Sequence, residues 1–155
     1  MEEPLAYFLT WTTYGTWLHG DNRGSVDQDH NQYGEPYLDP TEGLRRYESK
    51  LLKHAPIQLD PSQRDLVETI VRRDCGHRGY QLYALNCRSN HVHVVVQAQD
   101  VPAERVMAQF KSYATRGLRE IDSFTGKKVW TAGGSKRYLF TEDAIERAVQ
   151  YVNSQ

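Results

Sequence analysis

Residues 80–99 read YQLYALNCRSNHVHVVVQAQ, in which two strand-like runs flank three polar residues, Arg88, Ser89 and Asn90. The runs, residues 80–87 and 91–99, contain many β-branched and aromatic side chains, which favour strands. Because the connection between them is so short and polar, it predicts an antiparallel hairpin.

The segments on either side of this hairpin predict further strands and helices. Residues 5–14 are rich in aromatic and β-branched side chains and predict a strand, and residues 138–140 predict a short one. Helical spacing of apolar residues predicts helices from 61 to 76–79, over 102–121, and from 141 through 152. Since strands and helices mix without strict alternation, we expect an α+β fold with a mostly antiparallel sheet and helices packed on it.

Length and composition fit one domain spanning residues 1–155. A chain of 155 residues has the usual size of a single domain. Residues 15–50 form a polar insertion, which is long for a compact domain and predicts either a functional lid or a mobile insertion. A short helix is expected at its end, where Leu44, Tyr47 and Leu51 follow helical spacing.

Composition excludes several classes of protein. With 39% hydrophobic and 25% charged residues and a mean hydropathy of −0.72, no stretch approaches the roughly 20 apolar residues of a membrane span. The two cysteines indicate neither a disulfide framework nor a zinc module, and the acidic start lacks the features of a signal peptide. We therefore expect a cytoplasmic protein without a membrane partner.

The net charge of −1 hides an uneven distribution. Residues 1–43 carry eight acids and one base, whereas residues 101–140 carry eight bases and three acids. Such a basic segment is either a phosphate-binding face or simply a solvated helix face, and charge alone favours the solvated face.

His91 and His93 are the first candidates for chemistry. Side chains alternate along a strand, so both imidazoles should lie on one face and Val92, Val94 and Val96 on the other. Two histidines so placed can share a metal ion. The alternative is a pair of half-exposed polar residues on the solvent side of the sheet.

Tyr151 and Gln155 stand four residues apart in the last predicted helix and should share one of its faces. Tyrosine supplies a phenolic nucleophile, and glutamine supplies a neutral oxygen ligand. Alternatively, Tyr151 is a core aromatic and Gln155 a frayed terminal residue. Tyr113 is a rival nucleophile, but Gly117 stands four residues after it in place of a glutamine.

Together these residues resemble a known family. His91-Val92-His93 resembles the HUH motif (His, hydrophobe, His), and residues 151–155 resemble the Tyr-x-x-x-Gln signature of the single-tyrosine HUH transposases. That family includes insertion-sequence transposases that act on single-stranded DNA and the REP-associated tyrosine transposases. The resemblance covers most of the chain outside the insertion, but Arg88 and Ser89 stand where the family usually carries Met-Pro.

The resemblance implies a ferredoxin-like HUH endonuclease fold and a mechanism. His91, His93 and Gln155 would hold a divalent metal, Mg²⁺ or Mn²⁺, and Tyr151 would attack the scissile phosphate to give a 5′-phosphotyrosine and a free 3′-hydroxyl. The expected activity is metal-dependent nicking and strand transfer of single-stranded DNA, that is, DNA transposition.

The resemblance also implies single-stranded or hairpin DNA as partner, in the cytoplasm with nucleoid-associated DNA. The residues expected to bind it are Lys111, Arg116, Lys127, Lys128, Trp130, Lys136 and Arg137. Trp130 is equally a candidate core residue. A homodimer is possible in this family, because its members use either the tyrosine of their own subunit or that of a partner. The alternatives are a non-catalytic DNA- or RNA-binding protein derived from a transposase and, less favoured, a metal-dependent hydrolase.

Overall fold

The computed structural model describes residues 2–16, 52–121 and 124–155. The polar insertion and its expected helix therefore lie almost entirely outside the described residues. The described elements, in chain order, are β1 (Ala6–Thr12), α2 (Pro61–Arg78), β2 (Gln81–Cys87), β3 (His91–Gln97), α3 (Ala103–Leu118), β4 (Ser135–Leu139) and α4 (Glu142–Asn153).

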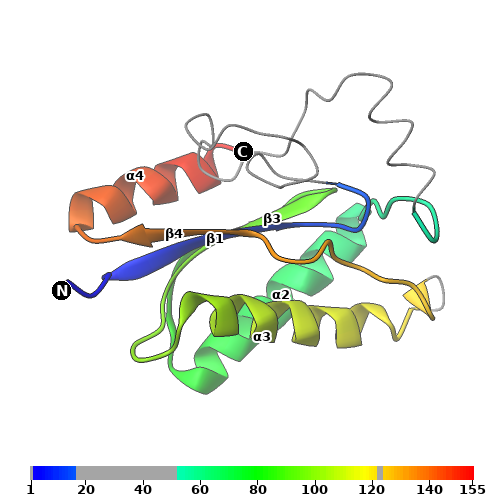
Figure 1. The fold of residues 1–155 in the computed structure, drawn as a ribbon, viewed down its shortest axis with the longest axis horizontal. Helices are drawn as coiled ribbons and strands as arrows, with labels where there is room; N and C mark the ends of the chain where they lie inside the picture. Colours follow the sequence, from blue (N-terminus) through cyan, green and yellow to red (C-terminus); the bar gives the residue numbers. More distant parts are fainter. Residues whose placement is uncertain (1, 17–51, 122–123) are drawn as a thin grey trace.

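The four strands form one antiparallel sheet in the order β2-β3-β1-β4. Among the described elements, the order from β1 to β4 is strand-helix-strand-strand-helix-strand, which with this strand order is the ferredoxin-like arrangement. The last helix, α4, lies on the face of the sheet opposite to α2 and α3 (Figure 1). The predicted α+β fold, with its antiparallel hairpin of β2 and β3, is confirmed.

Local sequence signals fix where the helices begin and end. The carboxylate of Asp60 accepts a hydrogen bond from the Gln63 backbone amide, and the Gln63 side chain accepts one from the Asp60 backbone amide. The two residues thus form a capping box at the start of α2, with Pro61 at the first helical position. Gly79 ends α2 in a left-handed conformation (φ 77°), which glycine adopts without strain. At α4, the hydroxyl of Thr141 accepts from the Ala144 amide.

The sheet has two apolar faces and therefore two cores. Toward α2 and α3, Val92, Val94 and Val96 of β3 join the larger core, together with side chains of both helices. Toward α4, Val95 joins a smaller core. The buried residues of this smaller core are Ala6, Phe8, Ala84, Val95, Leu139, Ile145, Ala148 and Val152. Since β3 is buried on both faces, α4 is held to the sheet by apolar packing of its own.

In the described part of the chain, no helix has the length and apolar character that crossing a membrane requires.

The two-core arrangement predicts distinct effects of two neighbouring substitutions. Val94 and Val95 are fully buried on opposite faces of β3. Val94→Ala and Val95→Ala should each lower the free energy of unfolding by about 2 kcal/mol, because each removes two buried methyl groups and leaves a cavity. Only Val95→Ala should also speed amide hydrogen exchange in α4. Equal acceleration of α4 exchange in both variants would contradict the separation of the cores.

Candidate active site

Strand β3 places His91 and His93 on the face that α4 covers, opposite to Val92 and Val94. Their ring centroids are 4.6 Å apart, and the side chains are 9% and 0% exposed. The expectation that both imidazoles share one face is therefore confirmed. The alternative of two half-exposed polar residues is wrong, because both histidines are buried.

Each imidazole is held through its Nδ1 atom. Nδ1 of His91 lies 2.8 Å from Oδ1 of Asn90, and Nδ1 of His93 lies 2.8 Å from the hydroxyl of Thr10. An amide oxygen only accepts, so Nδ1 of His91 is the protonated nitrogen, and its Nε2 carries a lone pair. Thr10 lies directly opposite His93 on β1. Both contacts orient a ring as the outer hydrogen bonds of a metal site do.

The Nε2 atoms of both histidines are buried and have no hydrogen-bond partner among residues 2–16, 52–121 and 124–155. Burial, and then the charge of Arg88, lowers the pKa of His91 to about 4. Burial, followed by the charges of His91 and Arg88, lowers the pKa of His93 to about 3. Both rings are thus neutral at neutral pH, and two adjacent neutral imidazoles whose Nε2 atoms have no partner among the described residues fit a divalent cation.

Tyr151 is brought to this pair by the last full turn of α4. Its ring centroid lies 5.6 Å from that of His93 and 6.0 Å from that of Phe8, and the side chain is half-buried. A phenol and the two imidazoles therefore converge within one chain. This juxtaposition of a nucleophile type with a candidate metal pair is the main chemical feature of the α4 face.

Asn86 ties the end of α4 to the sheet, and the sequence patterns above did not single it out. It lies opposite His93 on β2, and its Nδ2 atom donates to the carbonyl of Val152 at 3.0 Å. A polar residue inside an otherwise apolar strand, on the same face as the histidines, is the signal that could have identified it.

Gln155 departs from the expectation that it continues the helical face of Tyr151. Helix α4 ends at Asn153, and the amide of Ser154 is shared among the last carbonyls of the helix. This tightening of the final turn puts Gln155 beyond the helix, where it is exposed and its side-chain amide donates to the Tyr151 carbonyl at 3.3 Å.

The described residues contain no group of three His, Cys, Asp or Glu side chains able to hold a metal. A third ligand from this part of the chain must therefore be of another type, such as the amide oxygen of Gln155. The hydrolase alternative, which needs a carboxylate beside the two histidines, gains no support from the described residues.

Tyr113, the rival nucleophile, lies on the other side of the sheet. It belongs to α3, which covers the face opposite to α4 (Figure 1). The guanidinium carbons of Arg78 and Arg116 lie 5.6 and 5.7 Å from the centroid of its ring. Its place in the fold separates it from the imidazoles.

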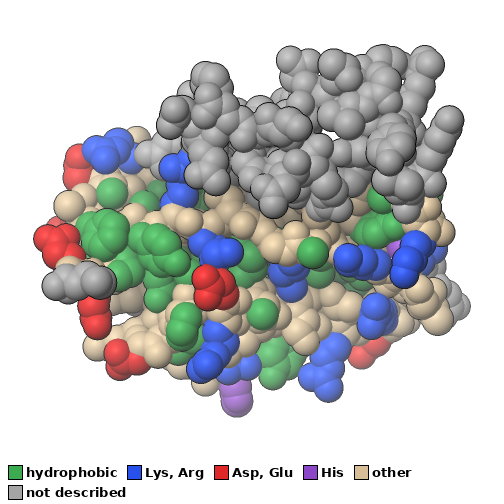
Figure 2. All heavy atoms as spheres, in the orientation of Figure 1, with side chains coloured by type: hydrophobic (Ala, Val, Ile, Leu, Met, Phe, Trp, Pro, Cys, Tyr) green, Lys and Arg blue, Asp and Glu red, His purple; other side chains and the backbone are tan. Residues whose placement is uncertain are grey.

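Most of the predicted DNA-binding residues gather along α3 and the segment that follows it, where Figure 2 shows a concentration of Lys and Arg side chains. There an open groove of about 370 Å³ is lined by Lys111, Arg116, Arg119 and Lys128, with no acidic residue in its wall. Arg119 was not among the predicted contacts. A groove lined by four cations in a chain of net charge −1 fits a polyanion.

Lys111 is partly enclosed at the base of this groove. Its Nζ atom donates to the carbonyls of Thr131 at 2.9 Å and Gly133 at 2.8 Å, which leaves one of its three protons for a ligand. Burial, and then the charges of Lys128 and Lys136, lowers the pKa of Lys111 to about 8.

The other residues predicted to bind DNA lie in the core, near the groove and on the two faces of β4. Trp130 is 5% exposed, and its ring packs edge-on against Trp11, so its burial supports the core role rather than stacking on a base. Lys127 is half-buried near the groove. Lys136 lies opposite Leu9 and Arg137 opposite Phe8, which places them on the α3 and α4 faces of β4, respectively.

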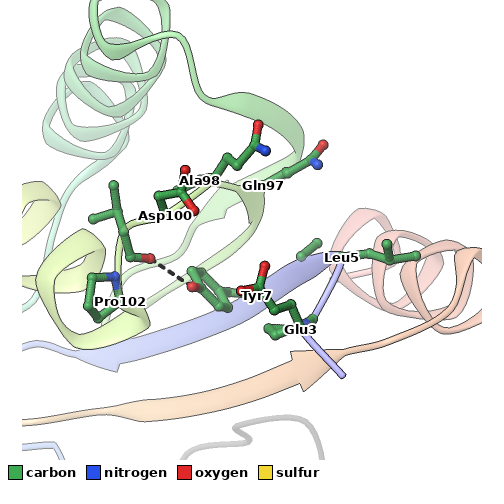
Figure 3. A pocket seen from close by; sticks show the side chains of 11 residues that line it. Glu3, Leu5, Tyr7, Gln97, Ala98, Asp100 and Pro102 are labelled. Atoms are coloured by element: carbon green, nitrogen blue, oxygen red, sulfur yellow. Dashed lines mark hydrogen bonds between the residues drawn. The ribbon is translucent and has the colours of Figure 1, made fainter. Parts of the chain in front are cut away.

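Another hollow, of about 460 Å³, lies at the opposite end of the sheet (Figure 3). There the hydroxyl of Tyr7 donates to the carbonyl of Val101 at 2.7 Å, and the charged side chains of the wall are the acids Glu3 and Asp100. Its charge does not suit a phosphate, so we do not place DNA in it.

Comparisons with known proteins concern the family and the fold. Residues 49–155 match the family model described as IS200-like transposase. The chain is also similar to the crystal structure of a candidate transposase from Deinococcus radiodurans R1, with 17% identity and a TM-score of 0.50 over all of this chain and 93% of that one. At this identity the similarity concerns the fold alone. No curated protein sequence matches the chain.

The bond from Asn86 to α4 predicts a local effect. Asn86→Ala should lower the free energy of unfolding by about 1 kcal/mol, because the Val152 carbonyl loses a donor, and should speed amide exchange over residues 150–155. Asn153→Ala, in an exposed side chain of the same turn, is the matched control. Indistinguishable exchange in the two variants would show that Asn86 does not hold the helix end.

Proposed function

We propose that this chain, which belongs to the IS200-like transposase family and so serves DNA transposition, cleaves and rejoins single-stranded DNA with Tyr151 as nucleophile. The observation that carries the proposal is the position of the Tyr151 ring, 5.6 Å from the buried ring of His93. Since nucleophile and imidazoles come from one chain, the proposed cleavage requires no second copy.

The proposed reaction is an exchange of phosphoesters. The phenolic oxygen of Tyr151 forms a bond to phosphorus, and the bond between phosphorus and the 3′ oxygen of the preceding nucleotide breaks. The phenolic proton is balanced by the proton that the leaving 3′ oxygen gains, which yields a 5′-phosphotyrosine and a 3′-hydroxyl. Because the ester is exchanged and not hydrolysed, the reverse step reseals a strand without another source of energy.

The unused Nε2 atoms of His91 and His93 support a metal-dependent reaction. These atoms, with the side-chain oxygen of Gln155, would hold Mg²⁺ or Mn²⁺. When bound, the cation supplies Lewis-acid stabilisation of the charge that develops on the phosphoryl oxygens. Asn90 and Thr10 hold the two rings with Nδ1 engaged, so that Nε2 stays available.

The groove on the α3 side supports binding of a nucleic acid backbone. Its four cations would each neutralise a phosphate, and such contacts weaken with salt. The groove and the Tyr151 site lie on opposite faces of the sheet, so one DNA molecule would contact both by passing around an edge or an end of the sheet. We therefore assign the groove to a hairpin stem or flanking strand, in nucleoid-associated DNA of the cytoplasm.

Formation of a covalent adduct tests the nucleophile. Incubation of the protein with a labelled single-stranded oligonucleotide and Mn²⁺ should give a protein–DNA species that survives denaturing electrophoresis. Tyr151→Phe should abolish this species, because the attacking oxygen is lost, while DNA affinity in a mobility-shift assay stays within about twofold, as the ring itself remains. Chelation of the metal should also prevent the adduct.

Tyr113→Phe serves as the control, because this tyrosine lies on the opposite face. An adduct that persists in Tyr151→Phe and disappears in Tyr113→Phe would overturn the assignment. Tight binding of DNA or RNA without an adduct under any metal would instead select a non-catalytic binding protein.

Lys111 predicts a pH dependence of DNA binding. As the pH rises from 7 to 9, it passes through the Lys111 pKa of about 8, the groove loses a positive charge, and the affinity should fall on the order of fivefold, the effect of one charge pair in water. Lys111→Arg keeps its charge over this range and should flatten the curve. Fluorescence anisotropy at constant ionic strength measures the DNA affinity of both proteins at each pH. If the affinities of the wild type and of Lys111→Arg change in parallel with pH, Lys111 lies outside the DNA interface.

A further inference from the structure

The hairpin that carries the histidines has an arginine at its turn. The register pairs Asn86 with His93 and Cys87 with Val92, so the next residue, Arg88, stands opposite His91. The Arg88 amide accordingly donates to the His91 carbonyl at 2.7 Å. Directly paired residues of an antiparallel sheet share a face, with Cβ atoms about 5 Å apart. Arg88 therefore begins on the same face as both histidines.

The backbone of the turn is fixed from two sides. The Leu59 amide donates to the Ser89 carbonyl at 2.7 Å, and the Thr13 amide donates to the Asn90 carbonyl at 2.9 Å. These bonds hold the base of the Arg88 side chain in place relative to the imidazoles. The side chain itself is exposed, and its guanidinium has no hydrogen-bond or ion-pair partner within the described residues.

The backbone pairing of Arg88 with His91 places a positively charged residue at the edge of the site. A cation in this position disfavours a second cation nearby. It is therefore unfavourable for holding a metal, and it favours an anion at the same place.

The chemistry of the side chain at this position suits an anionic ligand. A planar guanidinium pairs with two phosphate oxygens at once, which makes arginine suited to a phosphodiester.

We propose that Arg88 is a catalytic residue that binds the nonbridging oxygens of the scissile phosphate while Tyr151 attacks it. The inference rests on the proposed function, since it concerns the same reaction. Arg88 would neutralise the negative charge that increases as the phenolic oxygen bonds to phosphorus and the 3′ oxygen departs. The guanidinium gives up no proton and changes no bond in the step.

Arg88→Met tests the proposal in the full chain. The substitution keeps the backbone donor to His91, and circular dichroism and thermal melting check that the variant folds. Under single turnover at saturating DNA and Mn²⁺, adduct formation should slow by about a hundredfold, the lower end of the range for loss of one charge-stabilising donor. Arg88→Lys keeps the positive charge but lacks the planar guanidinium, so its rate of adduct formation should lie between those of the wild type and Arg88→Met.

Binding of Mn²⁺ without DNA, followed by electron paramagnetic resonance, gives a second readout of opposite sign. Removing a neighbouring positive charge should tighten Mn²⁺ binding, by about fivefold. A slower reaction together with tighter metal binding supports the proposal. A slower reaction together with weaker metal binding would mean that Arg88 merely shapes the hairpin, which would overturn it.

Arg105→Met, in an exposed side chain of α3 on the other face, is the charge-matched control. An equal loss of rate in this variant would overturn the proposal by showing a general charge effect, as would an unchanged rate in Arg88→Met. If the wild-type protein forms no adduct with any divalent metal, the proposed function fails and this inference fails with it. A wild-type adduct with an insensitive Arg88→Met overturns the inference alone.

Discussion

Strand β3 is buried on both faces, and this constraint determines where the chemistry lies. Because side chains alternate, a register that turns Val92, Val94 and Val96 into the larger core must turn His91 and His93 toward α4. A slip of one residue would place two imidazoles among the valines and expel the valines from the core. The two-residue turn of Ser89 and Asn90 fixes that register. Hydrophobic packing thus positions the polar pair, and Asn90 and Thr10 satisfy one nitrogen of each ring.

The sheet separates two kinds of surface. The α4 face combines neutral imidazoles, a phenol and apolar side chains, whereas the α3 side carries the groove of four cations. Edge strand β4 contributes to both, since Lys136 and Arg137 follow one another along a strand and lie on opposite faces. In the proposed function, the α4 face would cut the DNA strand, and the groove on the α3 side would hold a folded segment of the same DNA. This arrangement also explains how a chain of net charge −1 can present a strongly basic surface locally.

Short-range features of the fold were predictable, because they depend on neighbours in the sequence. The hairpin followed from two strand-like runs around Arg88, Ser89 and Asn90, and the start of α2 followed from Asp60 and Pro61. The shared face of the histidines followed from alternation alone. Side-chain environment was less predictable, since it depends on contacts far apart in the chain. Trp130 is equally suited to a core or to stacking until its packing against Trp11 is known, and the bond from Asn86 to α4 spans 66 residues. The exit of Gln155 from the helix depends on how the final turn closes around Ser154.

The neutrality of the buried imidazoles connects the packing of the fold to its chemistry. Burying a protonated histidine is costly without a paired anion, and the described residues contain no group of acids beside His91 and His93. Burial therefore keeps both rings uncharged at neutral pH, and their buried Nε2 atoms have no partner among the described residues. In the proposed reaction, such a site offers acceptors for a cation, and the described residues provide no carboxylate beside it to balance the charge of that cation. A phosphate that entered with the cation would balance this charge, and the exposed guanidinium at the turn would then meet an anion. Under that proposal, the burial that packs α4 on the sheet would favour a metal–phosphate pair over either component alone.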